Sequence, residues 1–378
     1  MPERATLLAA AVAPRSSSPT GRSLSVTGLR KSYSGTTVVD GVDMEIAAGE
    51  FVTFLGSSGS GKTTTLMMLA GFTEPDSGSV SVDGRDITRL SPGKRDFGFV
   101  FQQYLLFPHM TVFDNVAFPL QLRGVPKAEI RRRVGETLEA AGLSKFAGRR
   151  PRELSGGQQQ RVALCRVLVY RPPIVLMDEP LGALDKKLRD QMQTEIKSIQ
   201  RELGLTVVYV THDQEEALVL SDRIAIMKDG RIEQFDTPRG LFERPRTPFV
   251  ADFLGAANFL TGKVEEPGED GCTRVRLDTG GVLKARTHPC VPGQRVRAAV
   301  RPGRLRLGTS DDSCCTGTVE TAVYVGSLTR ISVRPDGSAP GTPPLRIETA
   351  LAPPRQGERV CVTADRDDVS LFDAADGG

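Results

Sequence analysis

Apolar and polar side chains alternate along residues 24–54, and turn-forming pairs interrupt the alternation. A repeat of two residues predicts strands of an antiparallel sheet. Residues 51–55 are instead almost uniformly apolar, which is typical of a strand buried on both faces. The pair Asp83-Gly84 predicts the turn of a further hairpin. The first part of the chain therefore combines a partly exposed sheet with a buried strand.

A period of three to four residues follows, and it predicts helices. One helix is expected over residues 63–70, and a longer helical region over about 107–165. The next helical stripe consists of Leu184, Leu188, Met192, Ile196, Ile199 and Leu203, ended by Gly204. Apolar strands are predicted at residues 174–177, 207–210 and 224–227. Because strands alternate with helices here, we expect a largely parallel sheet.

The pattern changes near residue 245, where short strands with many Gly and Pro residues replace the helical period. Residues 258–307 and 316–372 predict a compact all-β domain, with a loop at 336–344. The expected organisation is a disordered tail over residues 1–22, an α/β domain over 23–245 and a β domain over 246–378.

Composition narrows the possibilities. The chain has 378 residues, with 49 Lys and Arg against 46 Asp and Glu, and a net charge of +3. This balance indicates no large nucleic-acid surface. The six cysteines show no Cys-x-x-Cys spacing, so neither a zinc site nor a disulfide framework is implied. No apolar run reaches the length of a membrane span. The tail has a short apolar core and an early Glu3, unlike a signal peptide.

The stretch GSSGSGKT matches the Walker A pattern in full, after a predicted strand and at the start of a predicted helix. Its glycines let backbone N–H groups converge on phosphate oxygens at a helix N-terminus. We expect Lys62 to hold the β- and γ-phosphates of ATP, and Thr63 to bind Mg²⁺. The predicted nucleotide-binding residues of this loop are Gly56, Ser57, Ser58, Gly59, Ser60, Gly61, Lys62, Thr63 and Thr64.

Polar residues also follow the other predicted strands of the parallel sheet. Asp178 and Glu179 end an apolar strand, where they would hold Mg²⁺ through water and act as general base, respectively. His212 ends the next strand on the same edge, although a lone histidine is often structural. Gln102 ends another predicted strand and can offer its amide oxygen to Mg²⁺ or to the attacking water.

A second glycine-rich stretch, ELSGGQQQR, starts another predicted helix and can form a second anion site. Taken alone, it could be a polar helix start with a serine cap. In this order and spacing, however, the motifs resemble those of the ATP-binding-cassette (ABC) ATPases over residues 24–245. LSGGQ, at residues 154–158, is the diagnostic motif of that family. The resemblance implies a P-loop NTPase fold with a RecA-like core, an antiparallel β subdomain and a helical subdomain.

The resemblance also explains why two anion sites are present. In the family, the signature motif of one subunit closes over the γ-phosphate held by the Walker A loop of its partner. It implies a homodimer with ATP and Mg²⁺ as cofactors, in which Tyr33 stacks on adenine and Asp185 reaches across the dimer interface. His212 joins Glu179 as a catalytic residue. The implied signature residues are Ser155, Gly156, Gly157 and Gln158.

Residues 298–308 and 324–333 resemble the OB-like regulatory domain, called TOBE, of ABC importer ATPases. Within that group the chain is similar to ATPases that import spermidine and putrescine. This implies two transmembrane permease subunits, an external solute-binding protein, no nucleic acid, and a place on the cytoplasmic face of the inner membrane. Import of ferric iron, phosphonate, sulfate or sugar remains an alternative, and a soluble ABC ATPase without transport is a further one.

Overall fold

The computed structural model describes residues 21–182, 184–265, 272–286, 289–308 and 314–374. The chain forms two compact units, which meet in sequence between Pro238 and Arg239. The sequence analysis placed this boundary seven residues later, between 245 and 246. Each unit is described by itself.

Two residues of the predicted disordered tail are held in place. Gly21 N donates to Gly204 O at 2.9 Å, and the hydroxyl of Thr206 donates to Arg22 O at 2.7 Å. A side chain at position 21 would collide with the Gly204 carbonyl, since an added Cβ would lie 2.5 Å from it. The tail prediction is therefore wrong for residues 21 and 22, and its first 20 residues lie outside the described part.

The first unit begins with an antiparallel sheet in the order β2-β1-β4-β5. Its strands are β1 (Leu24–Tyr33), β2 (Thr36–Ile46), β4 (Ser77–Val82) and β5 (Arg85–Asp86). Asp83 and Gly84 form the turn between β4 and β5, with φ angles of 48° and 77°. Two positive φ angles in sequence characterise the tight hairpin turn that the sequence predicts.

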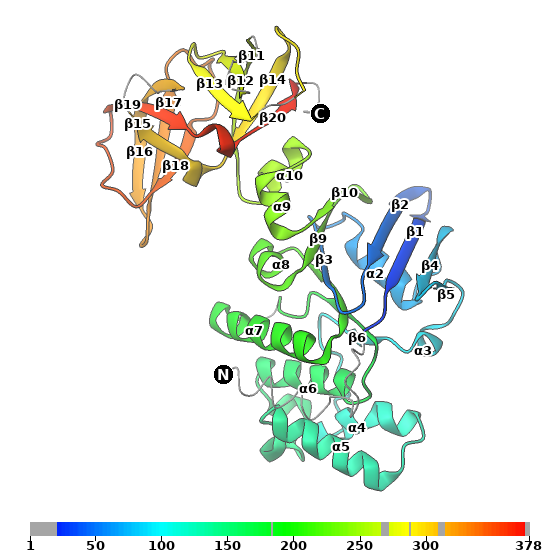
Figure 1. The fold of residues 1–378 in the computed structure, drawn as a ribbon. Coiled ribbons are helices and arrows are strands. Elements are labelled where there is room, and N and C mark those ends of the chain that lie inside the picture. The colour runs from blue at the N-terminus through cyan, green and yellow to red at the C-terminus, as the bar shows by residue number, and fades with distance from the viewer. Residues whose placement is uncertain (1–20, 183, 266–271, 287–288, 309–313, 375–378) are drawn as a thin grey trace. The chain divides into compact units, whose positions relative to one another are not determined.

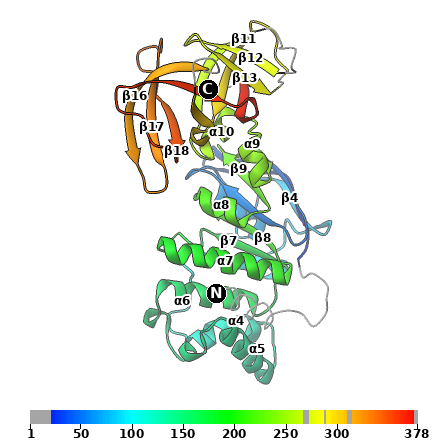
Figure 2. The same ribbon diagram turned by 60° about the vertical axis from the view of Figure 1, so that its left-hand side comes forward.

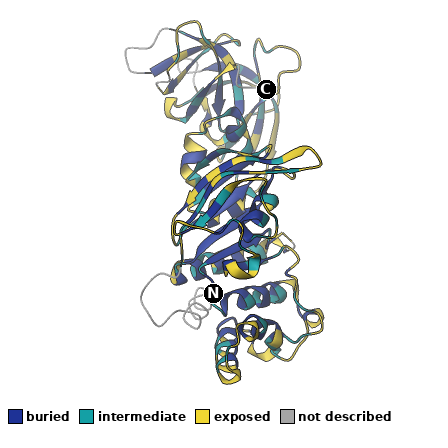
Figure 3. Cartoon of the chain, turned by 90° about the vertical axis from the view of Figure 1, so that its right-hand side faces the viewer, coloured by how far each residue is buried: buried dark blue, intermediate teal, exposed yellow. Residues whose placement is uncertain are grey.

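A six-stranded sheet forms the centre of the unit, in the order β10-β9-β3-β8-β7-β6. Its strands are β3 (Phe51–Leu55), β6 (Gly98–Val100), β7 (Ile174–Asp178), β8 (Thr206–Thr211), β9 (Arg223–Lys228) and β10 (Arg231–Asp236). All neighbours are parallel except β9 and β10. The carboxyl ends of the parallel strands therefore share one edge, where ligands bind in such sheets. Figure 3 shows that these central strands are mostly buried.

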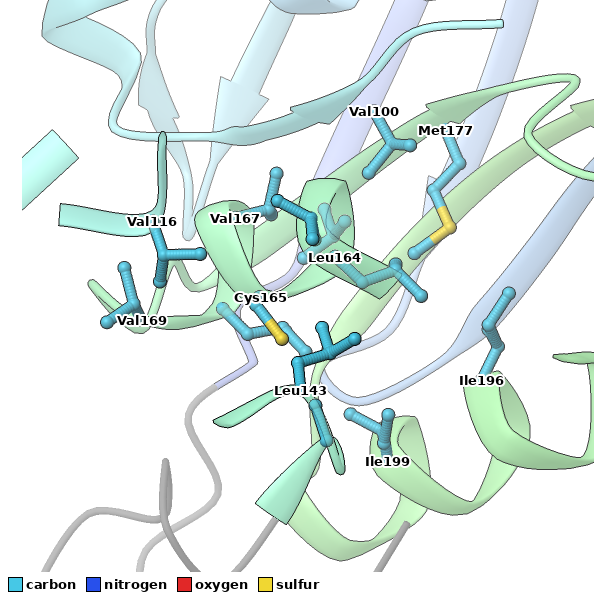
Figure 4. Packing of buried hydrophobic residues seen from close by; sticks show 14 of the residues in the cluster. Val100, Val116, Leu143, Leu164, Cys165, Val167, Val169, Met177, Ile196 and Ile199 are labelled. Carbon is cyan, nitrogen blue, oxygen red and sulfur yellow. The ribbon is translucent and has the colours of Figure 1, made fainter. Parts of the chain in front are cut away.

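The first unit also contains helices, some of which contact this sheet and some of which pack on other helices. They are α2 (Lys62–Ala70), α3 (Pro92–Arg95), α4 (Val112–Leu122), α5 (Lys127–Ala140), α6 (Gly156–Leu168), α7 (Lys186–Leu203) and α8 (Gln214–Leu220). Figures 1 and 2 both show α6 between α7 and the pair α4 and α5. In Figure 4, Leu164 and Val167 of α6 lie among apolar residues of β6, β7 and α7. Asp185 is the N-cap of α7, so Leu184, the first residue of the predicted helical stripe, lies before the helix.

The second unit begins with two helices that the sequence analysis missed, α9 (Pro238–Glu243) and α10 (Pro248–Phe253). They are too short for a helical period to stand out. The hydroxyl of Thr247 accepts a hydrogen bond from Val250 N at 3.3 Å, and Pro248 occupies the first turn of α10. This is a helix start that could have been read from the sequence.

The remainder of this unit is all β, as predicted. One sheet has the order β13-β12-β11-β14-β20 and the other β15-β19-β16-β17-β18. The strands of the first are β11 (Asn258–Val264), β12 (Cys272–Leu277), β13 (Val282–Arg286), β14 (Arg295–Val300) and β20 (Val369–Asp373). Those of the second are β15 (Leu305–Gly308), β16 (Cys315–Tyr324), β17 (Thr329–Pro335), β18 (Leu345–Thr349) and β19 (Arg359–Ala364). Both sheets contribute to one hydrophobic core, so the fold class is confirmed.

Candidate active site

The loop 56–61 connects β3 to α2 at the shared strand edge. Two of its glycines are sterically required. A Cβ on Gly56 would lie 2.4 Å from Met227 O, and one on Gly61 would lie 2.6 Å from Val38 O. Gly61 also has a φ of 95°, which glycine adopts readily. The loop is thus a tight turn that leads directly into a helix N-terminus, the geometry of a phosphate cradle.

Lys62 folds back over this loop. Its ammonium donates to Gly56 O at 2.9 Å and to Ser57 O at 2.7 Å. Burial lowers the pKa of Lys62, while the charges of Asp178 and Glu179 act in the opposite direction. Within the described part of the chain, the hydrogen bonds of Lys62 go to neutral carbonyls, and a buried cation of this kind gains strongly from an anionic ligand. The buried hydroxyl of Ser60 has no protein partner and is a further unused polar group of the loop.

Thr63 and Asp178 meet across the strand edge. The hydroxyl of Thr63 donates to Asp178 Oδ1 at 3.0 Å. Burial raises the pKa of Asp178, and the hydrogen bond from Thr63 opposes this rise. A buried carboxylate beside a hydroxyl provides the hard oxygen donors that Mg²⁺ prefers. The two predicted ligands are therefore adjacent and their chemistry fits this ion.

Glu179 lies at the centre of the remaining predicted residues. Its Oε2 is 3.1 Å from His212 Nδ1 and accepts a hydrogen bond from Gln102 Nε2 at 3.4 Å. The backbone turns sharply here, since Glu179 has a φ of 42° and its N–H donates to Val210 O at 3.0 Å. The side chain of Glu179 is 19% exposed and that of His212 is 61% exposed. The Glu179 carboxylate is therefore largely buried, whereas its partner His212 is open to solvent.

Gln102 presents its amide nitrogen to Glu179, so its oxygen is free for a ligand. The residue lies two positions beyond the end of β6, and not at the strand end as predicted. Its position beside Glu179 agrees with a place in the same site.

The sequence analysis missed a buried carboxylate behind the turn that carries His212. Glu216 is 2% exposed, and one of its oxygens accepts hydrogen bonds from Tyr209 and Thr211, each at 2.8 Å. Burial raises the pKa of Glu216. In the sequence Glu216 is one of two adjacent glutamates in a helix, and only the periodicity of α8 could have indicated which one points inward.

The signature motif caps α6. The amide oxygen of Gln158 accepts a hydrogen bond from Ser155 N at 3.0 Å, so Gln158 closes the helix start. Gly157 packs closely on α7, because a Cβ there would lie 2.6 Å from a methyl group of Leu188. Within the described ranges, no hydrogen bond joins residues 155–158 to the loop 56–63. One chain thus presents two separate helix N-termini.

Two predicted residues have contacts of their own. Tyr33, at the end of β1, is 48% exposed, and the ammonium of Lys31 lies 5.5 Å from its ring centroid. An exposed ring of this kind is available for stacking. The side chain of Asp185 accepts a hydrogen bond from Leu188 N at 3.0 Å and so caps α7. This local role accounts for Asp185 within one chain, and a contact across a dimer stays a prediction.

Among the described residues, no cluster of three or more His, Cys, Asp or Glu side chains could hold a metal ion. In the same part of the chain, no helix combines the length and hydropathy of a membrane span.

Comparisons with known proteins agree with this geometry. The ABC transporter family model matches residues 39–182, and the TOBE domain model matches residues 298–372. The spermidine/putrescine import ATP-binding protein PotA of Thermobifida fusca is 53% identical over 305 residues, which cover 79% of each chain. That of Rubrobacter xylanophilus is 51% identical over 315 residues, which cover 81% of this chain and 82% of the relative.

Solved structures give the same assignment. The ATP-binding cassette MJ0796, in a dimeric post-hydrolysis state with ADP and Pi, is 38% identical with a TM-score of 0.53. The match covers 57% of this chain and 99% of that cassette. For cbiO1 of Clostridium perfringens the identity is 32% and the TM-score 0.55, over 58% of this chain and 90% of cbiO1.

The central sheet, the glycine-rich loop and the Asp178-Glu179 strand end together define an ATPase of the ABC transporter class. Within this class, the chain belongs to the family of the spermidine/putrescine import ATP-binding proteins with a TOBE domain.

Proposed function

We propose that this chain is the ATP-hydrolysing subunit of a polyamine importer, with spermidine and putrescine as its substrates. The observation that carries the proposal is the identity of 53% to a spermidine/putrescine import ATP-binding protein. It extends over both units, because the match covers 79% of the chain. Import of ferric iron, phosphonate, sulfate or sugar is the alternative substrate assignment.

We assign the chemistry to residues at the shared strand edge and to Tyr33. Lys62 binds the β- and γ-phosphates, for which its buried ammonium has the complementary charge. Glu179 accepts the proton of the attacking water, and His212 holds Glu179 and contacts the γ-phosphate from its exposed position. The ring of Tyr33 stacks on adenine.

The chain's oxygen ligands fit Mg²⁺. Thr63 would hold the ion directly, Asp178 through water and Gln102 through its amide oxygen. When bound, Mg²⁺ supplies positive charge to the β- and γ-phosphate oxygens. The protein's part is to keep Thr63 and Asp178 adjacent and to leave the oxygen of Gln102 free.

Because the signature motif and the phosphate loop share no hydrogen bond within the described chain, we propose that each serves a different ATP. Two chains pair head to tail, so that Ser155, Gly156 and Gly157 of one chain close over the ATP on the loop of the other. Asp185 lies at this interface. Closure pulls on two transmembrane permease subunits at the cytoplasmic face of the inner membrane, and an external solute-binding protein delivers the substrate.

The test is uptake of labelled spermidine and putrescine by cells that lack this gene and carry a restored copy. Uptake should disappear on deletion and return with the wild-type chain but not with Glu179→Gln. Unchanged uptake after deletion would contradict the polyamine assignment while leaving the ATPase assignment intact. Uptake of ferric iron and phosphonate would then be measured in the same strains.

A further inference from the structure

Arg189, in the first turn of α7, has contacts that neither the family motifs nor the proposed mechanism use. We propose that Arg189 is a positioning residue that joins the backbone of Leu184 to the turn carrying His212 and so sets the geometry of the Glu179-His212 pair. This inference rests on the proposed roles of Glu179 and His212.

The guanidinium of Arg189 has three neighbours: Leu184, just before α7, and Asp213 and Glu216, both at the start of α8. Its Nη1 donates to Asp213 Oδ2 at 2.9 Å, and its Nη2 donates to Leu184 O at 3.1 Å. Its Nε lies 3.6 Å from Glu216 Oε1, without a hydrogen bond. The planar, forked guanidinium can address acceptors in different directions from one position.

On one side, these contacts fix both neighbours of His212 in the chain. Asp213 caps α8, since its Oδ1 accepts hydrogen bonds from Glu215 N at 2.8 Å and Glu216 N at 3.1 Å. The hydroxyl of Thr211 donates to Glu216 Oε2 and accepts from Asp213 N at 3.0 Å. His212 itself is exposed, so its orientation depends on these flanking anchors.

On the other side, Arg189 contacts Leu184 O, and Leu184 follows the proposed base, Glu179, in the chain. Gly182 N donates to Glu179 O at 3.3 Å, and Leu184 N donates to Leu181 O at 3.1 Å. Through these two hydrogen bonds, Leu184 is linked to Glu179. Arg189 therefore contacts one residue beyond each of the two strands whose ends meet in the Glu179-His212 contact.

The charges around Arg189 favour this arrangement. Its side chain and that of Asp213 are each 27% exposed, whereas the side chain of Glu216 is 3% exposed. Burial raises the pKa of Glu216 and Asp213 adds to the rise, while Tyr209, Thr211 and Arg189 oppose it. Loss of the Arg189 charge would leave two neighbouring carboxylates, one of them buried, without their shared cation.

The first measurement is the steady-state ATPase activity of the full chain carrying Arg189→Met. Misplacement of catalytic groups lowers turnover without touching nucleotide contacts, so we expect kcat to fall about tenfold to a hundredfold. The KM for ATP should stay within about twofold of the wild type. Arg201→Met removes an exposed arginine from the last turn of the same helix and should leave both constants unchanged.

The second measurement is the pH profile of kcat, which a purely structural ion pair would not change. Arg189 lowers the pKa of Glu216, so Arg189→Met should raise that pKa further. The Glu216 carboxylate accepts the hydrogen bonds of Tyr209 and of Thr211, the neighbour of His212, so its protonation would disturb the turn that positions His212. The acid limb of kcat should therefore move to higher pH in this variant. Arg189→Lys keeps the positive charge but loses the planar guanidinium. The acid limb of kcat should therefore stay at the wild-type pH, while kcat itself is still reduced.

Two outcomes would overturn the inference: a kcat of Arg189→Met within twofold of the wild type, or a loss of kcat with an unshifted acid limb. If Arg189→Met does not fold, kcat of Asp213→Asn is measured instead, because asparagine keeps the cap of α8 and removes the charge that pairs with Arg189. Wild-type kcat in that variant would equally overturn it. Turnover in Glu179→Gln would instead refute the proposed base, whatever the Arg189 variants show.

Discussion

Glu179 and His212 meet at the ends of two neighbouring parallel strands, with Glu179 Oε2 3.1 Å from His212 Nδ1. The backbone of Glu179 is tied to the same neighbour, since its N–H donates to Val210 O. The carboxylate and the histidine are thus placed by sheet hydrogen bonds and not by a mobile loop. A rigid placement of this kind suits the role that we propose for this pair, which is to hold a water molecule in line with a phosphate.

The first prediction concerns the glycine at the start of the phosphate loop. Gly56→Ala should destabilise the chain by about 1–3 kcal/mol, because its Cβ would press on the backbone carbonyl of Met227. ATP affinity should fall as well, since relief of the clash displaces the loop. Gly93→Ala, where nothing lies within 4 Å, is the matched control and should be close to neutral. Urea unfolding and ATP titration of both variants measure the effects, and equal stability of the two would refute the steric argument.

The second prediction concerns the sharing of sites between two chains. Lys62→Ala and Ser155→Arg should each abolish ATPase activity alone, because the two residues act on the same ATP from opposite chains. A mixture should regain activity, since a mixed dimer has one site with an intact loop and an intact signature motif. Activity is measured at constant total protein while the ratio of the two variants changes. A mixture as inactive as its components would count against the head-to-tail arrangement.

The third prediction concerns pH and α5. Arg132 and Arg133 lower the pKa of Glu129 to about 2. An acid with a depressed folded pKa contributes stability above its unfolded pKa, near 4.5, and this contribution is lost as the pH falls towards about 2. Glu129→Gln should therefore lower the Tm at pH 7, and the difference from the wild type should shrink between pH 5 and pH 3.

Glu139→Gln, an exposed position on the same helix, is the control for this pH series. It should leave the Tm close to the wild-type value throughout. A deficit of Glu129→Gln that is equal at pH 7 and pH 3 would show that charge is not its cause.

The elements that could be predicted from the sequence are those whose residues act through local pattern. The uniform apolar run of β3 and the glycine that ends α7 both depend on neighbours in the chain, and both were predicted. The turn between β3 and α2 was also predicted, because it depends on residues adjacent in the chain. Short helices such as α10 escaped, since six residues contain less than two full turns.

Contacts between residues far apart in the sequence explain the other features that were not predicted. Gly21 looks like part of a polar tail, and only its hydrogen bond to Gly204 reveals that it is anchored. Glu216 and Arg189 are ordinary charged residues of amphipathic helices until the fold brings them behind His212. Such contacts join residues whose neighbourhood is set by tertiary packing, so no local pattern marks them.

The most direct test of the account is the behaviour of purified Glu179→Gln with ATP and Mg²⁺, followed by light scattering and by phosphate release. Without its general base, the variant should release phosphate at least about a hundredfold more slowly than the wild type. With ATP it should shift from the mass of one 40.8 kDa chain to that of two. The wild type should return to single chains as ATP is consumed. Wild-type turnover, or a variant that stays a single chain at saturating ATP, would contradict the account.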